Sequence, residues 1–169
     1  MSDITPLMPR QPVPSLELPL VGGGTKALGD PAGARFIVLV FYRGLHCLRC
    51  NPYLNLYEAM LPEFEALGAE VIAVSVDVRA KAEQSYAEWG LKNLKMAYGF
   101  PIADAPAWGL YVTDGTRPQD PPQFVEPALF ITGPDGALDH GIINTAQRLR
   151  PDPAAVLDHL KDRIAEARG

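Results

Sequence analysis

The sequence has few cysteines and histidines and no long apolar run. Two cysteines and three histidines occur among its 169 residues. A structural zinc site needs four ligands, usually arranged as two pairs, so metal binding is the weaker explanation of the two cysteines. No apolar run approaches the ~18 residues that a membrane-spanning helix requires. The net charge is −5 and no basic stripe is visible, which argues against nucleic acid as a partner. We expect a protein that uses no metal, cofactor, nucleic acid or membrane.

A secretory signal is also lacking, because the first twenty residues do not combine a charged start with an apolar core. We therefore expect a cytoplasmic location, where an isolated pair of cysteines is more often catalytic or metal-binding than structural. Apolar residues make up 47% of the chain and charged residues 21%, which is typical of a soluble globular protein. The proline-rich residues 1–13 predict an extended arm, and residues 14–169 are long enough for one domain.

One stretch organises the rest of the chain. Residues 36–41 form a short apolar run rich in β-branched and aromatic residues, which predicts a buried central strand. Gly44 interrupts the run, and Cys47 and Cys50 follow in a C-x-x-C pattern. An amphipathic pattern over residues 48–67 then predicts a helix. The cysteines thus precede a helix N-terminus, where free N–H groups and the helix dipole stabilise a thiolate.

The remaining segments predict an alternation of strands and helices. Strand, helix and strand in succession form a βαβ unit, which gives parallel pairing in a sheet covered by helices. Asp152 is the predicted N-cap of the last helix, with Pro153 in its first position. Strands are predicted at residues 16–18, 69–77, 96–100, 128–132 and 137–143, helices at 78–90 and from 153, turns at 22–24, 30–33 and 133–136, and a loop at 113–123.

This order and three motifs resemble the thioredoxin-like superfamily. The motifs are FIVLVFYRGLHCLRC, AEVIAVSVD and PALFITGPDGAL, and the resemblance covers residues 14–160. The chain is most similar to the peroxiredoxin-like branch, the alkyl hydroperoxide reductase and thiol-specific antioxidant (AhpC/TSA) family. That resemblance implies an α/β, thioredoxin-like fold with a central mixed β-sheet flanked by helices. It also implies a redox-active cysteine at the first helix N-terminus.

Two chemistries occur among such proteins, and the sequence carries features of both. The peroxiredoxin pattern P-x-x-x-[TS]-x-x-C places Arg43 at its proline, Cys47 at its Thr or Ser, and Cys50 at the cysteine that attacks peroxide. Peroxiredoxins also carry an arginine just before the late strand, where this chain has Pro127. Thioredoxins have C-x-x-C at the same place and a proline before the late strand, whose preceding peptide bond is cis.

The resemblance makes Cys47 and Cys50 the catalytic residues. The thioredoxin pattern makes Cys47 the nucleophile and Cys50 the resolving thiol, whereas the peroxiredoxin pattern makes Cys50 the attacker. We favour Cys47, because it lies nearer the outer end of the helix and should be the more exposed. A neighbouring cation lowers a thiol pKa. A further short helix is predicted after residues 101–104, through residue 109, and an aromatic side chain on it can line the site. The candidate substrate-binding residues are Arg43, Arg49, Pro127 and Trp108.

We therefore predict a thiol-dependent oxidoreductase with a dithiol–disulfide pair. It would either exchange disulfides or reduce hydroperoxides as an antioxidant, with electrons from a thioredoxin- or glutaredoxin-like dithiol reductant. Many such proteins form dimers, so a homodimer is compatible with the resemblance. The alternative hypothesis is a redox-inert binding module on the same fold. It is favoured by the altered peroxidase pattern and the unusual Leu48-Arg49 pair between the cysteines.

Overall fold

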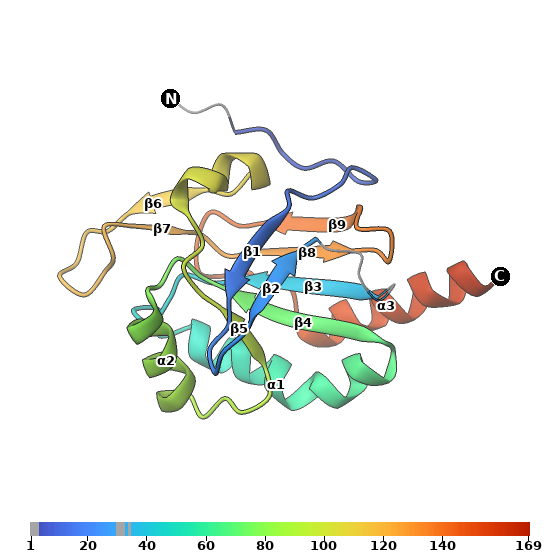
Figure 1. Ribbon diagram of the computed structural model, residues 1–169, viewed down its shortest axis with the longest axis horizontal. Coiled ribbons are helices and arrows are strands. Elements are labelled where there is room, and N and C mark those ends of the chain that lie inside the picture. The colour runs from blue at the N-terminus through green and yellow to red at the C-terminus, as the bar shows by residue number, and fades with distance from the viewer. Residues whose placement is uncertain (1–3, 30–32, 34) are drawn as a thin grey trace.

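A five-stranded mixed β-sheet forms the centre of the computed structural model, which describes residues 4–29, 33 and 35–169. The strand order is β5-β4-β3-β8-β9, in which β3, β4 and β5 are parallel and β8 and β9 are antiparallel to their neighbours. The predicted α/β fold with a mixed sheet flanked by helices is confirmed (Figure 1). The sheet strands are β3 (Phe36–Phe41), β4 (Ala69–Val74), β5 (Lys95–Ala97), β8 (Ala128–Thr132) and β9 (Leu138–Ile143).

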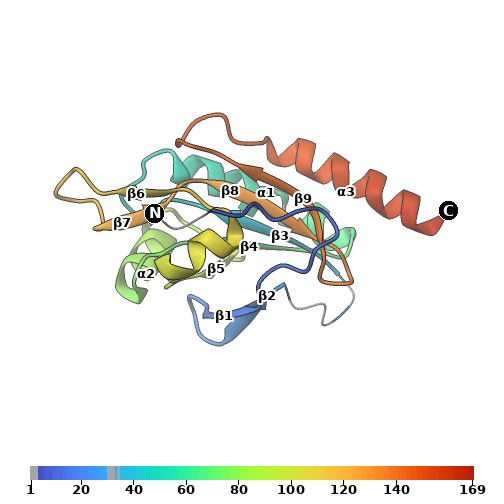
Figure 2. The same ribbon diagram turned by 90° about the horizontal axis from the view of Figure 1, so that it is seen from above.

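Three helices contribute side chains to the core on one face of this sheet: α1 (Cys50–Ala66), α2 (Arg79–Glu88) and α3 (Pro153–Arg168). The other face is covered by the hairpin of β1 (Leu16–Pro19) and β2 (Thr25–Leu28) and by the short helix η1 (Ile102–Trp108). Seen from above, α1 and α3 lie on one side of the sheet and the β1–β2 hairpin on the other (Figure 2). Asp152 caps α3 as predicted, because its side chain accepts a hydrogen bond from the Ala154 N–H.

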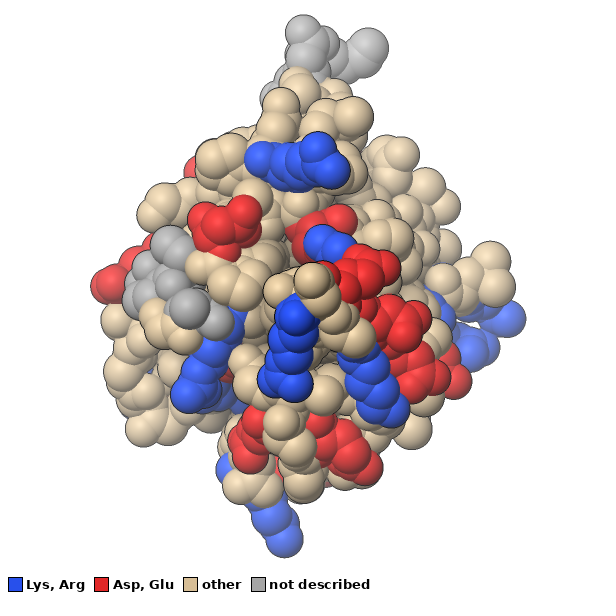
Figure 3. Space-filling view, turned by 90° about the vertical axis from the view of Figure 1, so that its right-hand side faces the viewer, with Lys and Arg blue, Asp and Glu red and all other residues tan. Residues whose placement is uncertain are grey.

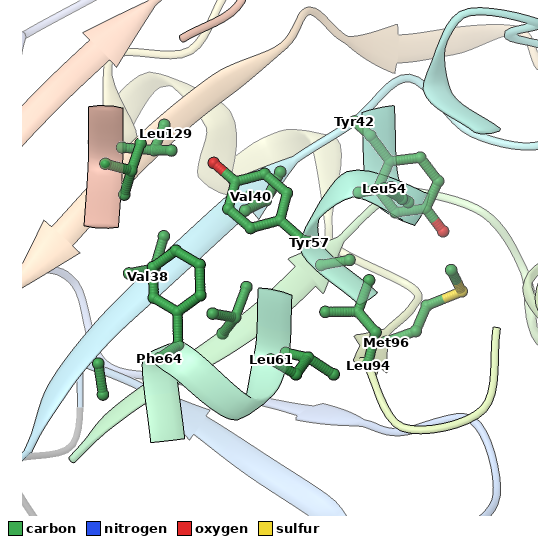
Figure 4. Close-up of a cluster of buried hydrophobic side chains, with 14 of the residues drawn as sticks. Val38, Val40, Tyr42, Leu54, Tyr57, Leu61, Phe64, Leu94, Met96 and Leu129 are labelled. Carbon is green, nitrogen blue, oxygen red and sulfur yellow. The ribbon is translucent and has the colours of Figure 1, made fainter. Parts of the chain in front are cut away.

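Strand β3 is buried along its whole length because both of its faces are covered. Val38 and Val40 point toward the helices, where they pack against the α1 side chains Leu54 and Tyr57 (Figure 4). Phe41 points to the opposite face, where its ring lies among other aromatic rings. The continuous apolar run of the sequence thus reflects a strand between two cores.

The sequence predictions differ from the structure in several places, among them β2, which was not predicted, and β5, which ends at Ala97 instead of residue 100. Residues 113–123 do not form a simple loop, because β6 (Val112–Asp114) and β7 (Gln123–Val125) pair as a hairpin on which Phe124 and Val125 are buried. Strand β4 also ends at Val74, three residues before the predicted end. The turn predicted at residues 30–33 lies largely outside the described residues.

The described part of the N-terminal arm, residues 4–13, contains no helix or regular strand, and it lies against the late hairpin. The Arg10 N–H donates to the Leu138 carbonyl at 2.8 Å, and Val13 is buried. None of the helices in the described part of the chain is both long and apolar enough to cross a membrane.

Candidate active site

The turn after β3 presents the two cysteines. The Cys47 N–H donates to the Gly44 carbonyl, and the Cys50 N–H donates to the Cys47 carbonyl, each at 3.0 Å. Gly44 has a φ of 123°, and a Cβ at this position would lie 2.6 Å from Oδ1 of Asp77. Only glycine tolerates both conditions, so the glycine that ends the apolar run is needed for the shape of this turn.

Asp77, which follows β4 in the chain, fixes the turn between β3 and the cysteines. Its side chain is buried, and its Oδ2 accepts a hydrogen bond from the Leu45 N–H at 2.8 Å. Burial raises the pKa of this carboxyl, and the Leu45 N–H opposes that shift. Asp77 therefore fixes the backbone that leads to Cys47 rather than contacting either thiol itself.

Cys47 and Cys50 are free thiols, with exposed fractions of 1% and 0%. The sequence predicts only that Cys47 is the more exposed of the two. Both are buried, because the segment between β9 and α3, residues 144–152, covers the pair. Nη2 of Arg150 lies 3.1 Å from Sγ of Cys50 and 3.7 Å from Sγ of Cys47. The Cys47 thiol also faces Oε1 of Gln147 at 3.7 Å. One guanidinium group thus bridges both sulfur atoms.

The two thiols differ in acidity. The hydrogen bond from Cys50 and the charge of Arg150 together outweigh burial and lower the pKa of Cys47 to about 6. Burial and the neighbouring Cys47 sulfur raise the pKa of Cys50 well above its ordinary value. Near neutral pH, Cys47 is therefore the thiolate and Cys50 the thiol that donates to it. Although burial disfavours its charge, Arg150 has a raised pKa because it faces both sulfurs.

Arg43 lies next to this pair but does not bond to a sulfur. Its Nη1 donates to Oε1 of Gln147 at 2.9 Å, and its Nε lies 3.5 Å from Oε2 of the buried Glu126. Its guanidinium carbon lies 4.5 Å from the centroid of the Phe124 ring. Arg43 therefore orients Gln147, which in turn contacts Cys47.

Arg150 is held in place by Tyr53 of α1. The guanidinium carbon of Arg150 lies 5.0 Å from the centroid of the Tyr53 ring. The Tyr53 hydroxyl donates to the carbonyl of Pro151, the next residue, at 2.8 Å. Helices α1 and α3 lie side by side on the same face of the sheet, and this adjacency brings Arg150 to the cysteines.

The other candidate residues lie farther from the sulfur atoms or outside the site. Arg49 is exposed, and its side chain forms no hydrogen bond or ion pair with the described residues. Pro127 is buried directly before β8. The first residue of β8, Ala128, pairs with Phe41 at the end of β3 that leads to the cysteines. The peptide bond between Glu126 and Pro127 is trans. Trp108 lies in the core on the opposite face of the sheet, 5.6 Å from the Phe41 ring and fully buried.

His46, which precedes Cys47, supplies no positive charge to it. Its ring lies 4.6 Å from the Phe124 ring, and neither ring nitrogen has a hydrogen-bond partner among the described residues. Burial lowers the pKa of His46 to about 4, so the ring is neutral at physiological pH.

Sequence reasoning missed Arg150 and Gln147. Arg150 stands directly before the Pro-Asp-Pro sequence that opens α3, and the pattern there indicates only a helix start. The available signal was indirect: α1 and α3 both have an apolar face, and both cover the same face of the sheet. That signal can place α3 beside α1, but it cannot select which of the residues before α3 points at the sulfur.

Comparisons with known proteins identify the family and the fold. The family described as the AhpC/TSA family matches residues 9–140. Among solved structures, a peroxiredoxin 6 of Arenicola marina is 19% identical with a TM-score of 0.78, over 95% of this chain and 75% of that one. A peroxiredoxin-like protein from Aquifex aeolicus is 17% identical with a TM-score of 0.77, over 94% of this chain and 90% of that one. A PrxQ of Xylella fastidiosa is 20% identical with a TM-score of 0.72, over 96% and 99% of the two chains. These similarities confirm the thioredoxin-like fold. None of the curated proteins compared with the chain matches it.

Proposed function

The chain belongs to the AhpC/TSA family and is a thiol-dependent oxidoreductase, and from this premise we propose that it reduces hydroperoxides. In this proposal Cys47 is the attacking thiolate and Cys50 the resolving thiol. The observation that carries the proposal is the position of Arg150, which contacts both sulfurs with one nitrogen. Its other two nitrogens, Nε and Nη1, are buried without a hydrogen-bond partner among the described residues.

Arg150 supplies the cation that the peroxiredoxin pattern places elsewhere. The resemblance puts that arginine just before the late strand, where this chain has Pro127. Arg150 reaches the same thiols from the segment before α3. A buried donor without a partner is unfavourable, so Nε and Nη1 favour binding of an oxygen acceptor beside the sulfur. The two oxygens of a hydroperoxide fit that requirement.

The choice of Cys47 follows from its acidity, because the thiolate is the nucleophile in this chemistry. With a pKa of about 6, Cys47 is mostly thiolate at neutral pH, whereas the raised pKa keeps Cys50 protonated. Cys50 can therefore donate to the Cys47 thiolate before the reaction and act as the second thiol afterwards.

The reaction proceeds in three balanced steps. The Cys47 thiolate attacks one peroxide oxygen, the O–O bond breaks, and the departing alkoxide takes a proton and leaves as an alcohol, or as water from hydrogen peroxide. Cys47 is then a sulfenic acid. The Cys50 sulfur attacks that sulfur and releases water, which leaves a Cys47–Cys50 disulfide. An external dithiol reduces this disulfide and becomes a disulfide itself.

Disulfide exchange is the second candidate function. The C-x-x-C spacing, the acidic first cysteine and the proline before β8 all favour it. The unpartnered Nε and Nη1 of Arg150 favour the peroxidase, because a hydroperoxide offers oxygen acceptors to these donors and a disulfide does not. The remaining parts of the proposal are a thioredoxin- or glutaredoxin-like reductant, a single domain over residues 14–169, a possible homodimer and a cytoplasmic location.

Stopped-flow reaction of the reduced protein with hydrogen peroxide tests the proposal, with tryptophan fluorescence and a free-thiol count as readouts. We expect rapid loss of both thiols at low peroxide and a product whose disulfide lies within one chain. Cys50→Ser is the matched control: it should still react with peroxide, but it should stop at a sulfenic acid that a dimedone-type probe captures. Slow reaction with peroxide and ready exchange with a small disulfide would instead support the second candidate.

A further inference from the structure

Two leucines beside the thiols are more exposed than any other large apolar side chain of the described residues. Leu48 has an exposed fraction of 87% and Leu149 of 95%, compared with 63% for the next one, Val78. Leu48 stands between the two cysteines. Leu149 stands between Gln147 and Arg150, whose side chains both contact the thiols. The two most exposed apolar side chains therefore border the same site from two distant segments.

Folding does not account for Leu149. Its φ is 58°, in the left-handed region that side-chain-bearing residues avoid. That conformation costs a leucine roughly 1 kcal/mol relative to a permissive residue such as glycine. Its side chain gains almost no burial in return. A strained and solvated leucine next to reactive groups indicates a surface used for binding.

Positive charge accompanies the two leucines. Arg49 follows Leu48 and Arg148 precedes Leu149; both are exposed, and neither forms an ion pair with the described residues. The whole chain carries a net charge of −5, so this local excess of arginine is opposite to the average. The end of the molecule near the C-terminus of α3 differs, because Lys and Arg alternate there with Asp and Glu (Figure 3).

We propose that Leu48, Arg49, Arg148 and Leu149, the thiol rim, form the docking surface for a protein dithiol reductant whose own thiols are surrounded by apolar side chains and carboxylates. This inference rests on the proposed function, because only a catalytic cycle requires repeated reduction of the Cys47–Cys50 disulfide. A small thiol would need neither exposed leucines nor a charged rim. A protein donor needs both, since apolar contact gives affinity and charge complementarity speeds encounter.

The reduction that the rim serves is an ordinary dithiol–disulfide exchange. One thiolate of the donor attacks Sγ of Cys47, and the Cys47–Cys50 bond breaks. Cys50 leaves as a thiolate and takes a proton. The second thiol of the donor then attacks its partner in the mixed disulfide, which frees Cys47 and leaves the donor oxidised.

The experiment uses the full chain, oxidised beforehand with diamide so that it does not depend on peroxide turnover. Reduction is followed by tryptophan fluorescence with two probes: an acidic thioredoxin kept reduced by its reductase, and dithiothreitol. In the double variant Leu48→Ser/Leu149→Ser, we expect the second-order rate constant with thioredoxin to fall by about tenfold, as when apolar anchors of an interface are removed. The rate with dithiothreitol should stay within about twofold of the wild type. Leu56→Ser is the matched control, because Leu56 is also exposed but lies on α1 away from the thiol rim.

Leu149→Gly separates docking from folding. Glycine relieves the left-handed strain, so the variant should unfold at a higher temperature than the wild type. It should nevertheless be reduced more slowly by thioredoxin. Arg148→Glu should be reduced by thioredoxin more slowly than the wild type at low salt, and the rate should depend less on ionic strength.

Three results would overturn the inference. The first is that the Leu48→Ser/Leu149→Ser and Leu149→Gly variants are reduced by thioredoxin as fast as Leu56→Ser, and the second is that they lose as much rate with dithiothreitol as with thioredoxin. The third is that dithiothreitol reduces the oxidised wild type and thioredoxin does not. Failure of the proposed function is a different observation, namely a reduced wild type that reacts slowly with hydrogen peroxide. Because the disulfide is made with diamide, the docking test can succeed or fail independently of that result.

Discussion

The two ends of the central sheet differ in whether their charged and polar side chains have partners. At the amino end of β4, Glu70 is paired with both Lys26 and Lys95, and these ion pairs together outweigh burial and lower its pKa. At the carboxyl end, around the cysteines, Arg150, His46 and Asp77 each keep at least one buried polar atom without a partner among the described residues.

The amino end of the sheet therefore contributes to stability, and the carboxyl end contributes to reactivity. The paired charges of Glu70, Lys26 and Lys95 stabilise the fold, and the Glu70 carboxylate has both of its oxygens occupied by the two lysines. Unpartnered donors at the carboxyl end cost stability, which the rest of the fold must offset, and such groups concentrate where a substrate is to be bound. The following four predictions test the contrast, from the largest expected effect to the smallest.

Removing the nucleophile should have the largest effect. Cys47→Ser should lower the rate of reaction with peroxide by at least about a thousandfold, because a serine hydroxyl is not ionised at neutral pH. Competition kinetics with peroxide measures the loss, and circular dichroism checks that the fold is kept. A variant that still loses its remaining thiol rapidly would make Cys50 the attacker.

Removing the buried indole on the other face of the sheet should affect folding alone. Trp108→Ala should lower the free energy of unfolding by about 3–5 kcal/mol, the usual cost of truncating a buried tryptophan. The pH profile of thiol alkylation should not change. Trp108→Phe, which keeps most of the packing, is the milder companion variant for urea titration. A shifted alkylation profile in the phenylalanine variant would instead return Trp108 to the site, as the sequence first predicted.

Removing the bridging cation should lower reactivity without lowering the free energy of unfolding. Arg150→Gln should raise the pKa of Cys47 from about 6 toward its ordinary value. Its alkylation rate at pH 7 should then fall by roughly tenfold, the order expected when a thiolate loses a close cation. Above pH 9 the variant and the wild type should react at similar rates, since Cys47 is ionised in both. Iodoacetamide kinetics across this range measures the shift, with Arg49→Gln as the control for an exposed arginine. Coincident profiles for Arg150→Gln and the wild type would show that Arg150 does not stabilise the thiolate.

Breaking an ion pair at the amino end should have the smallest effect. Lys26→Met should lower the free energy of unfolding by less than about 1 kcal/mol. Because the folded pKa of Glu70 is lowered, the pairs stabilise the fold above the ordinary titration range of a glutamate, and this contribution is lost as pH falls through the folded value. Urea titrations at pH 7 and pH 3 should therefore show a difference between variant and wild type that shrinks in acid, while peroxide kinetics stays constant.

The sequence predicted the parts of this molecule that depend on local pattern. The apolar run of β3, Gly44, and the helix that starts at Cys50 all follow from periodicity and turn chemistry, and they place two thiols at a helix N-terminus. The β6–β7 hairpin was missed because prolines and charges in residues 115–122 hide two very short strands. Arg150 was missed for a different reason. Its role depends on the packing of α3 beside α1, and no local pattern records which side chain such packing brings to a distant sulfur.

The contact between Arg150 and Cys50 joins residues 100 positions apart in the chain. During synthesis, the cysteines therefore emerge long before the guanidinium that makes one of them acidic. A nascent chain that ends before α3 holds two thiols without this cation, and they should react more slowly with stray oxidants and disulfides. The hydrogen bond from Cys50 can form earlier, but the contribution of Arg150 to the low pKa of Cys47 is added only when the segment before α3 has packed over the thiols, so the site is completed with the last part of the fold.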